Sequence, residues 1–438
     1  MSIADTTRRK LLGNIVWLYA LQGLNYLVPL AVLPYLIRVL GVERYGLIAF
    51  AQAFAQYFVI LTDYGFNLSA TKRIALIRND RDELSVTYWS VLLIKFGFMA
   101  LGALAATVVV LGIPRFRSDA ILYAISYLAV LGNVLFPVWF FQGMEQMRYI
   151  SVLTGATRLL GALLIFAVVH KPSDYVLALA VQSGALLIAG IAGFWTAIMR
   201  FHIPFRVPST ADLVRALSDG WHLFVSNAAG TLYATTNVFL VGLVAGNVQA
   251  GYFSAAEKIV RSIQGMLGPI TQAVYPHVSG LAAKSREAAL QFIRKSLVWI
   301  GVLSFVPAAL LLVFARPIAT ILLRNAADGS LTPLRWMAML PFVISVSTVL
   351  AIQTMIPFGM EKQLSRIYVV AGLFSLLFSL PLIHQFGASG GAAAVLVVEV
   401  CIVVAMWHRL NRDGIALRFR SVATIQTIEK VSKDAFSC

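Results

Sequence analysis

Long apolar runs, separated by short polar segments, recur along the chain from Leu12 to Trp407. Each run is about 20 residues long, the length that an α-helix needs to cross the hydrocarbon core of a membrane. None shows the alternation of apolar and polar residues that is typical of membrane β-barrel strands. The pattern predicts an all-α polytopic membrane protein with about twelve transmembrane helices, at residues 12–37, 46–67, 87–112, 119–141, 150–169, 174–198, 221–244, 251–278, 296–315, 333–357, 366–386 and 388–407.

The composition supports this class. Of the 438 residues, 59% are hydrophobic and only 12% are charged, against roughly 25% charged in an average soluble domain. The mean hydropathy is +0.82. A soluble protein of this length has no way to bury so much apolar surface, so lipid must be its main solvent.

Basic residues outnumber acidic ones, 35 to 19, which gives a formal net charge of +16. In a soluble protein this excess would indicate nucleic acid, but here the basic residues cluster in short segments between the apolar runs. If the N-terminus is cytoplasmic, 23 of them fall on that face and 8 on the other. Lys and Arg are enriched on the cytoplasmic side of membrane proteins. We therefore expect both termini to be cytoplasmic, and we expect no nucleic-acid partner.

An internal repeat divides the chain. The 14 residues that begin at Val39 align with those that begin at Val244, and Gly41 and Gly46 both match glycines 205 residues further on. Six predicted spans separate the two copies, which predicts a parallel repeat of two six-helix bundles with a pathway between them. We expect an N-terminal bundle, a proline-containing cytoplasmic linker, a C-terminal bundle and a basic cytoplasmic tail, at residues 1–199, 200–220, 221–407 and 408–438.

Four cations, Lys95, Arg158, Lys258 and Arg261, lie inside the predicted spans. A charge at the centre of a membrane helix costs at least about 2.5–3.5 kcal/mol, so such side chains normally face the bundle interior or a water-filled cavity. A cavity lined by cations suits an anionic substrate. These four residues are the predicted substrate-binding residues.

Three charges share the eighth predicted span: Glu257, Lys258 and Arg261. Lys258 and Arg261 are three apart and share a helix face, whereas Glu257 and Arg261 are four apart and can pair. An ion pair that only fixes helix packing is thus the alternative to a binding site. Prolines further along the span predict a broken helix, a feature common at transporter binding sites, at Pro269 and Pro276.

Lys95 and Arg158 lie eight or nine residues inside their spans, about 12–14 Å from the cytoplasmic face by helical rise. The alternative to a lining role is that they snorkel toward the lipid head groups.

Two acids join Glu257 as candidates for coupling or pairing. Asp63 closes the second span and is expected to pair with Lys72 or Arg73, or to fix a loop through backbone hydrogen bonds. Glu399 lies inside the last span. Its carboxyl group either carries a coupling proton or stays protonated without a role in coupling.

Several motifs are absent from the sequence. There is no G-x-x-x-x-G-K-[ST] loop for ATP, no H-E-x-x-H and no Cys/His spacing typical of a metal site. We therefore expect no metal and no cofactor. No nucleophile and base are placed together in the sequence, and we expect the chain not to be an enzyme.

Short strings in the first two spans and in the eighth resemble those of Wzx-type O-antigen and polysaccharide flippases. They are LPYL, RVLG, YGL and DYGFNLSAT at residues 33–36, 38–41, 45–47 and 63–71, and GYFSAAEKI at residues 251–259. The resemblance implies two six-helix bundles that work by alternating access. It also implies transfer of undecaprenyl-diphosphate-linked oligosaccharide repeat units across the bacterial inner membrane, within lipopolysaccharide or other polysaccharide biosynthesis.

The partners implied by the resemblance are that lipid-linked glycan, membrane lipids, and a polysaccharide polymerase with its chain-length regulator. Two other functions stay open. A cation-coupled multidrug extruder of the same superfamily requires acidic residues in the N-terminal cavity, where only Asp63 is available. A membrane enzyme such as a polysaccharide polymerase or ligase requires a long periplasmic loop, and the longest external loop expected here, about residues 316–332, has fewer than twenty residues.

Overall fold

The computed structural model describes residues 3–415, except for the side chains of residues 3–22, 24–25, 222–223, 225–234, 268–273, 275–277 and 283. Its regular elements over the described residues are helices. The first half contains α1 (Ile3–Asp63), α2 (Phe66–Leu76), α3 (Arg81–Gly112), α4 (Pro114–Arg117), α5 (Ala120–Leu135), α6 (Val138–Gly143), α7 (Met147–Val168) and α8 (Tyr175–Phe201). The second contains α9 (Thr210–Ala245), α10 (Asn247–Lys284), α11 (Arg286–Val313), α12 (Ala315–Leu323), α13 (Ala327–Met337), α14 (Leu340–Thr348), a π-helical turn η3 (Val349–Met355) and α15 (Glu361–Arg412).

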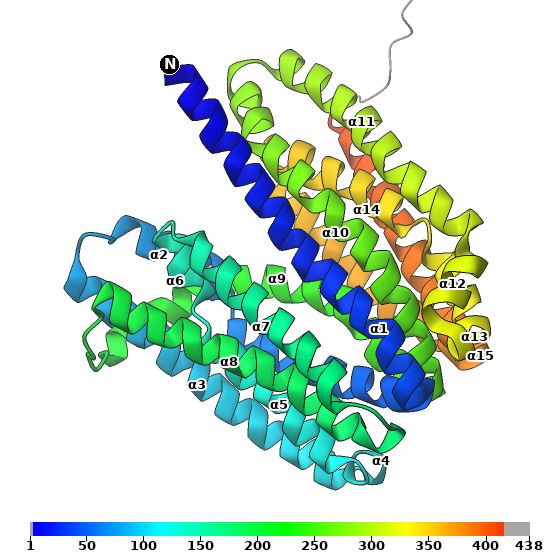
Figure 1. Ribbon diagram of the computed structural model, residues 1–438. Helices are drawn as coiled ribbons and strands as arrows, with labels where there is room; N and C mark the ends of the chain where they lie inside the picture. The colour runs from blue at the N-terminus through cyan, green and yellow to red at the C-terminus, as the bar shows by residue number, and fades with distance from the viewer. Residues whose placement is uncertain (1–2, 416–438) are drawn as a thin grey trace, which may run out of the picture.

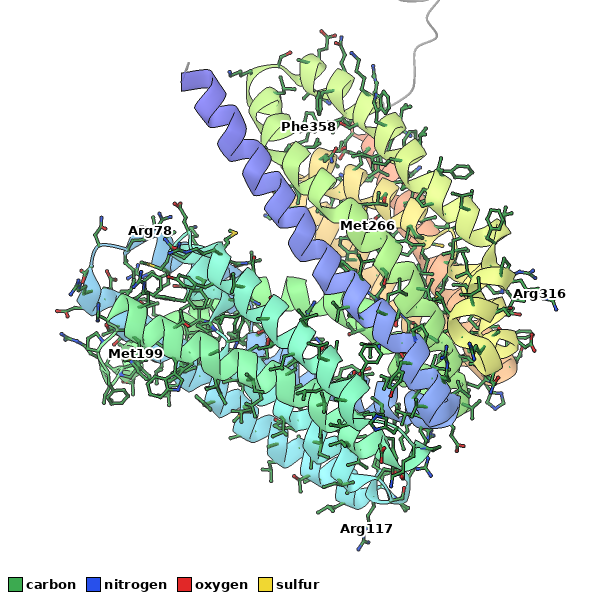
Figure 2. The ribbon with its side chains drawn as sticks, in the orientation of Figure 1. Arg78, Arg117, Met199, Met266, Arg316 and Phe358 are labelled. Carbon is green, nitrogen blue, oxygen red and sulfur yellow. The ribbon has the colours of Figure 1, made fainter. Side chains whose placement is uncertain are left out.

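The helices form two lobes that diverge at one end and meet at the other (Figure 1). The first lobe contains α2 to α8, and the second contains α10 to α15. The first part of α1 lies along α10, and α9 contacts both lobes, because it packs against α2 and α3 and also against α15. Arg78 and Phe358 lie at the divergent end, here called the open end, while Arg117 and Arg316 lie at the opposite, closed end (Figure 2).

The repeated glycines explain how the lobes meet at the closed end. Gly41 interrupts α1 and Gly246 precedes α10, and their φ values are nearly equal, 79° and 91°, in the region that favours glycine. One turn further on, α1 and α10 cross almost in backbone contact. A Cβ on Gly46 would lie 1.8 Å from the Asn247 carbonyl oxygen, and one on Gly251 would lie 2.3 Å from that of Val42. The two copies of the repeat therefore form a reciprocal crossing that tolerates no side chain.

Eight helical segments within the described residues are long and apolar enough to cross a membrane, and the all-α polytopic fold predicted from the sequence is confirmed. Several of these segments contain a break, among them those at Gly41 and Gly387. The exact number of crossings, about twelve, and the domain boundaries stay predictions. Of the predicted basic tail, residues 416–438 lie outside the described residues.

One local expectation was wrong. Helix α10 continues without a break through the positions of Pro269 and Pro276, so a broken helix lends no support to a site there. The predicted external loop at about residues 316–332 is largely helical, since α12 and α13 occupy most of it. Proline is accepted within helices where neighbouring helices satisfy the freed carbonyl groups, which is why its position alone does not predict a break.

Candidate functional site

A cavity of about 760 Å³ lies within the first lobe, where α1, α5, α7 and α8 surround it. Helix α10 of the second lobe contributes Lys258 to its wall. Apolar residues of α1, among them Val32 and Leu36, form one side. The cavity is therefore bounded by both lobes, although most of its wall belongs to the first.

Amide side chains give the cavity a neutral polar wall. Gln52 and Gln56, four residues apart on α1, share a helix face, and Gln182 of α8 lies opposite. The Gln52 Nε2 donates to the Gln182 Oε1 at 3.1 Å. The sequence reasoning missed these residues, although amides at helical spacing within an apolar run are a readable signal. Such a wall provides hydrogen-bond donors and acceptors for a polar ligand without adding charge.

Asp63 lines the cavity at the end of α1. The chain turns there because Tyr64 and Gly65 have φ values of 40° and 74°, a conformation that glycine adopts at little cost. This turn lies within the DYGFNLSAT string and fixes the direction of the Asp63 side chain. A carboxylate at a helix C-terminus lies beside the negative end of the helix dipole, so Asp63 requires a compensating cation.

Lys95 of α3 supplies that cation. Its side chain is only 2% exposed, and its Nζ donates to the Asp63 Oδ1 at 3.3 Å and to the Asn133 carbonyl oxygen at 3.1 Å. The Asn133 Nδ2 donates to the same Asp63 oxygen at 2.9 Å. Asn133 lies in the last turn of α5, which ends just before Pro137, a residue with no N–H to continue the helix. The ammonium group therefore lies at the C-terminal ends of two helices, where positive charge is favourable.

Lys95 thus lies behind the cavity wall, not on it, and it does not snorkel. Asp63 pairs with Lys95 and not with the two cations nearer in the chain that were expected, Lys72 and Arg73. Arg73 instead pairs with Glu83. Because Asp63 and Lys95 neutralise each other, this part of the wall carries little net charge.

Arg158, in the middle of α7, lines the cavity. Lys258 lines it from the other lobe, with its Nζ 5.1 Å from the centre of the Tyr45 ring. A cation over an aromatic face is stabilised by the ring quadrupole, and the Tyr45 hydroxyl is itself 3.4 Å from the Ser254 Oγ. The two cations are therefore held on the same cavity by different lobes.

Arg261, one helical turn beyond Lys258, is not among the residues that line this cavity. Its guanidinium group pairs with Glu257 at 2.7 Å within the same helix, and its side chain is 48% exposed. Tyr26 of α1 interacts electrostatically with both Arg158 and Arg261, and Glu399 of α15 interacts with Arg261. Arg158 and Arg261 thus approach the same part of α1 from the two lobes.

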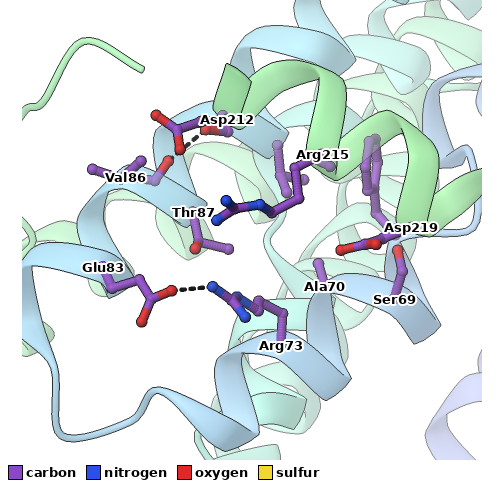
Figure 3. A pocket seen from close by; sticks show the side chains of 13 residues that line it. Ser69, Ala70, Arg73, Glu83, Val86, Thr87, Asp212, Arg215 and Asp219 are labelled. Atoms are coloured by element: carbon purple, nitrogen blue, oxygen red, sulfur yellow. Dashed lines mark hydrogen bonds and ion pairs between the residues drawn. The ribbon is translucent and has the colours of Figure 1, made fainter. Parts of the chain in front are cut away.

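A second, smaller pocket of about 50 Å³ lies at the open end, between α2, α3 and the first turns of α9 (Figure 3). Arg73 and Glu83 pair on one side of it, and Arg215 lies on the other, between Asp212 and Asp219. Its volume is far below the roughly 300–1,000 Å³ of typical ligand pockets. This pocket is too small to hold an oligosaccharide, so the larger cavity is the candidate site.

Ion pairs also tie the loops together at the open end. Arg78, in the connection after α2, pairs with Glu145, in the connection before α7, at 2.6 Å. The hydrogen bond from Arg78 lowers the pKa of the Glu145 carboxyl group.

Among the described residues, no three His, Cys, Asp or Glu side chains are grouped so that they could hold a metal ion.

Comparison with known families gives a match over most of the chain. The model of a family described as "Polysaccharide biosynthesis protein" matches residues 11–282. A protein of Escherichia coli (strain K12) named "Putative O-antigen transporter" is 34% identical over 94% of this chain and 99% of its own. A Shigella dysenteriae protein of the same name is 34% identical over 90% of this chain and 98% of its own.

Solved structures share the fold at low sequence identity. "Lipid II flippase MurJ, inward closed conformation" has a TM-score of 0.67 and 13% identity, over 92% of this chain and 87% of that one. An inward-facing multidrug resistance MATE family transporter of the MOP superfamily has a TM-score of 0.59 and 14% identity, over 89% of this chain and 98% of that one. At this identity, the likeness concerns the fold alone.

Proposed function

The chain belongs to the polysaccharide biosynthesis protein family, and from this membership and its cationic cavity we propose that it is a lipid-linked glycan flippase. Its substrate is an undecaprenyl-diphosphate-linked oligosaccharide repeat unit of O-antigen or of another surface polysaccharide. The protein moves this unit from the cytoplasmic to the periplasmic leaflet of the bacterial inner membrane. The names of its relatives are those of transporters, which agrees with the expectation that the chain is not an enzyme.

One observation carries the proposal: Arg158 and Lys258 line the same cavity from different lobes. A diphosphate that joins a lipid to a sugar ionises on each phosphate, and guanidinium and ammonium groups are its usual partners. The cavity carboxylate, Asp63, pairs with Lys95 behind the wall. The amide wall formed by Gln52 and Gln182 then faces the sugars.

Arg261 extends the same cationic face of α10 toward the open end. Because Arg261 is paired with Glu257, we propose that it receives the incoming diphosphate and passes it to Lys258. Lys95 acts as a positioning residue for Asp63. Glu399, which interacts with Arg261, is the proposed carrier of a coupling proton.

The arrangement of the lobes supports alternating access. They diverge at the end that bears Arg78 and meet where α1 and α10 cross (Figure 2). By the distribution of basic residues, the open end is cytoplasmic, with both termini on that side. Rocking about the closed end would open the cavity to the periplasm, with residues 200–220 as the linker between two rigid bundles.

The experiment that tests this function compares a strain lacking the gene with its parent. We expect loss of surface polysaccharide, with mass spectrometry finding the lipid-linked repeat unit accumulated in the cytoplasmic leaflet. Unchanged polysaccharide together with altered drug tolerance would favour the cation-coupled extruder and reject the flippase. The proposed polymerase and chain-length regulator partners are tested separately, by co-purification from the parent strain.

A further inference from the structure

A third cavity, also on the first lobe, is apolar. It is a groove of about 290 Å³ between α7 and α8, which lie side by side along the lobe (Figure 1). Nine residues line it, and all but Thr157 lack a polar side-chain group. The proposed function leaves this groove without a role.

The groove adjoins the cationic cavity. Thr157, Gly161 and Ala185 line both of them, so the wall between the two is only one layer of small side chains. A Cβ on Gly161 would lie 3.1 Å from that of Ala185, which shows how closely the helices approach. Arg158, the cation of the first lobe, follows Thr157 in the chain. A ligand with a charged group at Arg158 therefore has an apolar surface immediately beside it.

The outer rim of the groove faces away from the protein core. Leu160, Leu164 and Ile188 are 47%, 40% and 48% exposed, and on a membrane-spanning lobe such apolar side chains face lipid. Two of the lining residues are glycines, Gly161 and Gly184, and they leave gaps that the methyl branches of an isoprenoid chain can fill. This shape suits a long, flexible apolar chain that enters from the bilayer.

We infer that the groove between α7 and α8 binds the polyisoprenoid tail of the lipid-linked substrate, starting beside Arg158. The inference rests on the proposed function, because the tail and the diphosphate belong to one molecule. It places the tail on the outer face of the first lobe and not in the gap between the lobes. The groove then provides specificity for a long isoprenoid chain, while the cations bind the diphosphate.

The test uses Gly184→Leu. A Cβ on Gly184 meets nothing within 4 Å, so a larger side chain has open space in the groove that Gly184 lines. Gly97→Leu is the matched control, since Gly97 lies on α3 and also meets nothing within 4 Å. Both variants and the wild type are reconstituted in liposomes. Each is given two diphosphate-linked glycans, one on a full-length polyprenyl chain and one on a short isoprenoid chain.

We expect Gly184→Leu to slow transfer of the long-chain substrate about tenfold, which corresponds to about 1.4 kcal/mol, and to leave the short-chain substrate unaffected. Gly97→Leu should transfer both at the wild-type rate. Equal slowing of both substrates by Gly184→Leu, or of neither, would overturn the tail assignment while leaving the flippase intact. If the wild-type protein transfers neither substrate, the proposed function itself fails.

A second measurement needs no substitution. A photoreactive polyprenyl diphosphate should crosslink to peptides of α7 and α8, and unlabelled lipid-linked glycan should compete with it. A photoreactive phospholipid should label these peptides no more than it labels α3. Equal labelling by the phospholipid, without competition, would mean that the groove holds only ordinary bilayer lipid and would overturn the inference.

Discussion

Each lobe contains an ion pair at membrane depth. The two pairs differ in how far apart the partners lie in the chain and in how exposed the cation is. Lys95 and Asp63 are 32 residues apart in the chain, on two helices, and the lysine side chain is 2% exposed. Arg261 and Glu257 are one helical turn apart, and the arginine side chain is 48% exposed. The first pair joins α1, α3 and α5, whereas the second joins only neighbouring positions of α10.

Membrane depth alone therefore does not identify a binding cation. A buried cation that has a carboxylate and a helix C-terminal carbonyl group as partners stabilises the fold. A cation on the wall of a cavity, such as Arg158 or Lys258, remains accessible to a ligand. Arg261 is intermediate, because it is exposed but already shares its charge with Glu257.

The largest effect is expected from Lys95→Met. Removing one partner of a buried ion pair typically costs up to about 3–5 kcal/mol, and Asp63, which is 23% exposed, loses its cation beside the negative end of α1. We expect a strong fall in the unfolding temperature in detergent and in the level of protein in the membrane. Lys72→Met, at an exposed position of α2, is the control and should change neither. If Lys95→Met is as stable as this control, the pair has no structural role.

The Asp63→Asn, Lys95→Met double variant sharpens that result. With the carboxylate gone, no uncompensated charge remains, and the amide oxygen introduced at position 63 still accepts from the Asn133 Nδ2. We expect the double variant to recover more than half of the stability lost in Lys95→Met. Additive losses in the double-mutant cycle would show that the two residues do not interact.

Arg158→Gln and Lys258→Gln should impair transport and not folding. Truncating one charged partner of a hydrogen-bonded charge pair typically costs about 2–5 kcal/mol of binding, so we expect at least about a tenfold loss of transport for each. Arg158→Lys, which keeps the charge, should retain more activity than Arg158→Gln. Transport is measured in liposomes, with the amount of reconstituted protein as the control. Wild-type transport by both glutamine variants would remove the cavity cations from the mechanism.

The smallest effect is expected from Arg261→Gln. An exposed pair four residues apart on a helix contributes only about 0.3–0.5 kcal/mol to stability, so the level of protein should not change. Transport should fall, but less than in Arg158→Gln, because Glu257 already offsets the charge of Arg261. A fall as large as that of Arg158→Gln would place Arg261 at the main binding site.

Much of the fold was predictable, because apolar length and the repeated glycines are local signals. The reciprocal crossing of α1 and α10 was implicit in the match of Gly41 and Gly46 to Gly246 and Gly251. The partner of Asp63 was not predictable. Lys72 and Arg73 are nearer in the chain, and only the packing of α3 against α1 and α5 brings Lys95 to the carboxylate.

The candidate site, too, could be predicted from the sequence only in part. Arg158 and Lys258 were found from their charge within apolar runs, and both line the cavity. Gln52 and Gln182 were missed, because uncharged amides weigh less in a search for charge at membrane depth. The continuity of α10 through Pro269 was also unpredictable, since it depends on how neighbouring helices satisfy the backbone there.

The central claim is that two cations on one cavity recognise the diphosphate of a lipid-linked glycan. The most direct measurement is the rate at which liposomes containing the protein transfer a fluorescent polyprenyl diphosphate glycan between leaflets, compared with the monophosphate analogue. We predict that the wild type prefers the diphosphate and that the Arg158→Gln, Lys258→Gln double variant loses both the preference and most of the rate. Equal rates for the two lipids in the wild type, or an unchanged preference in the double variant, would contradict the claim.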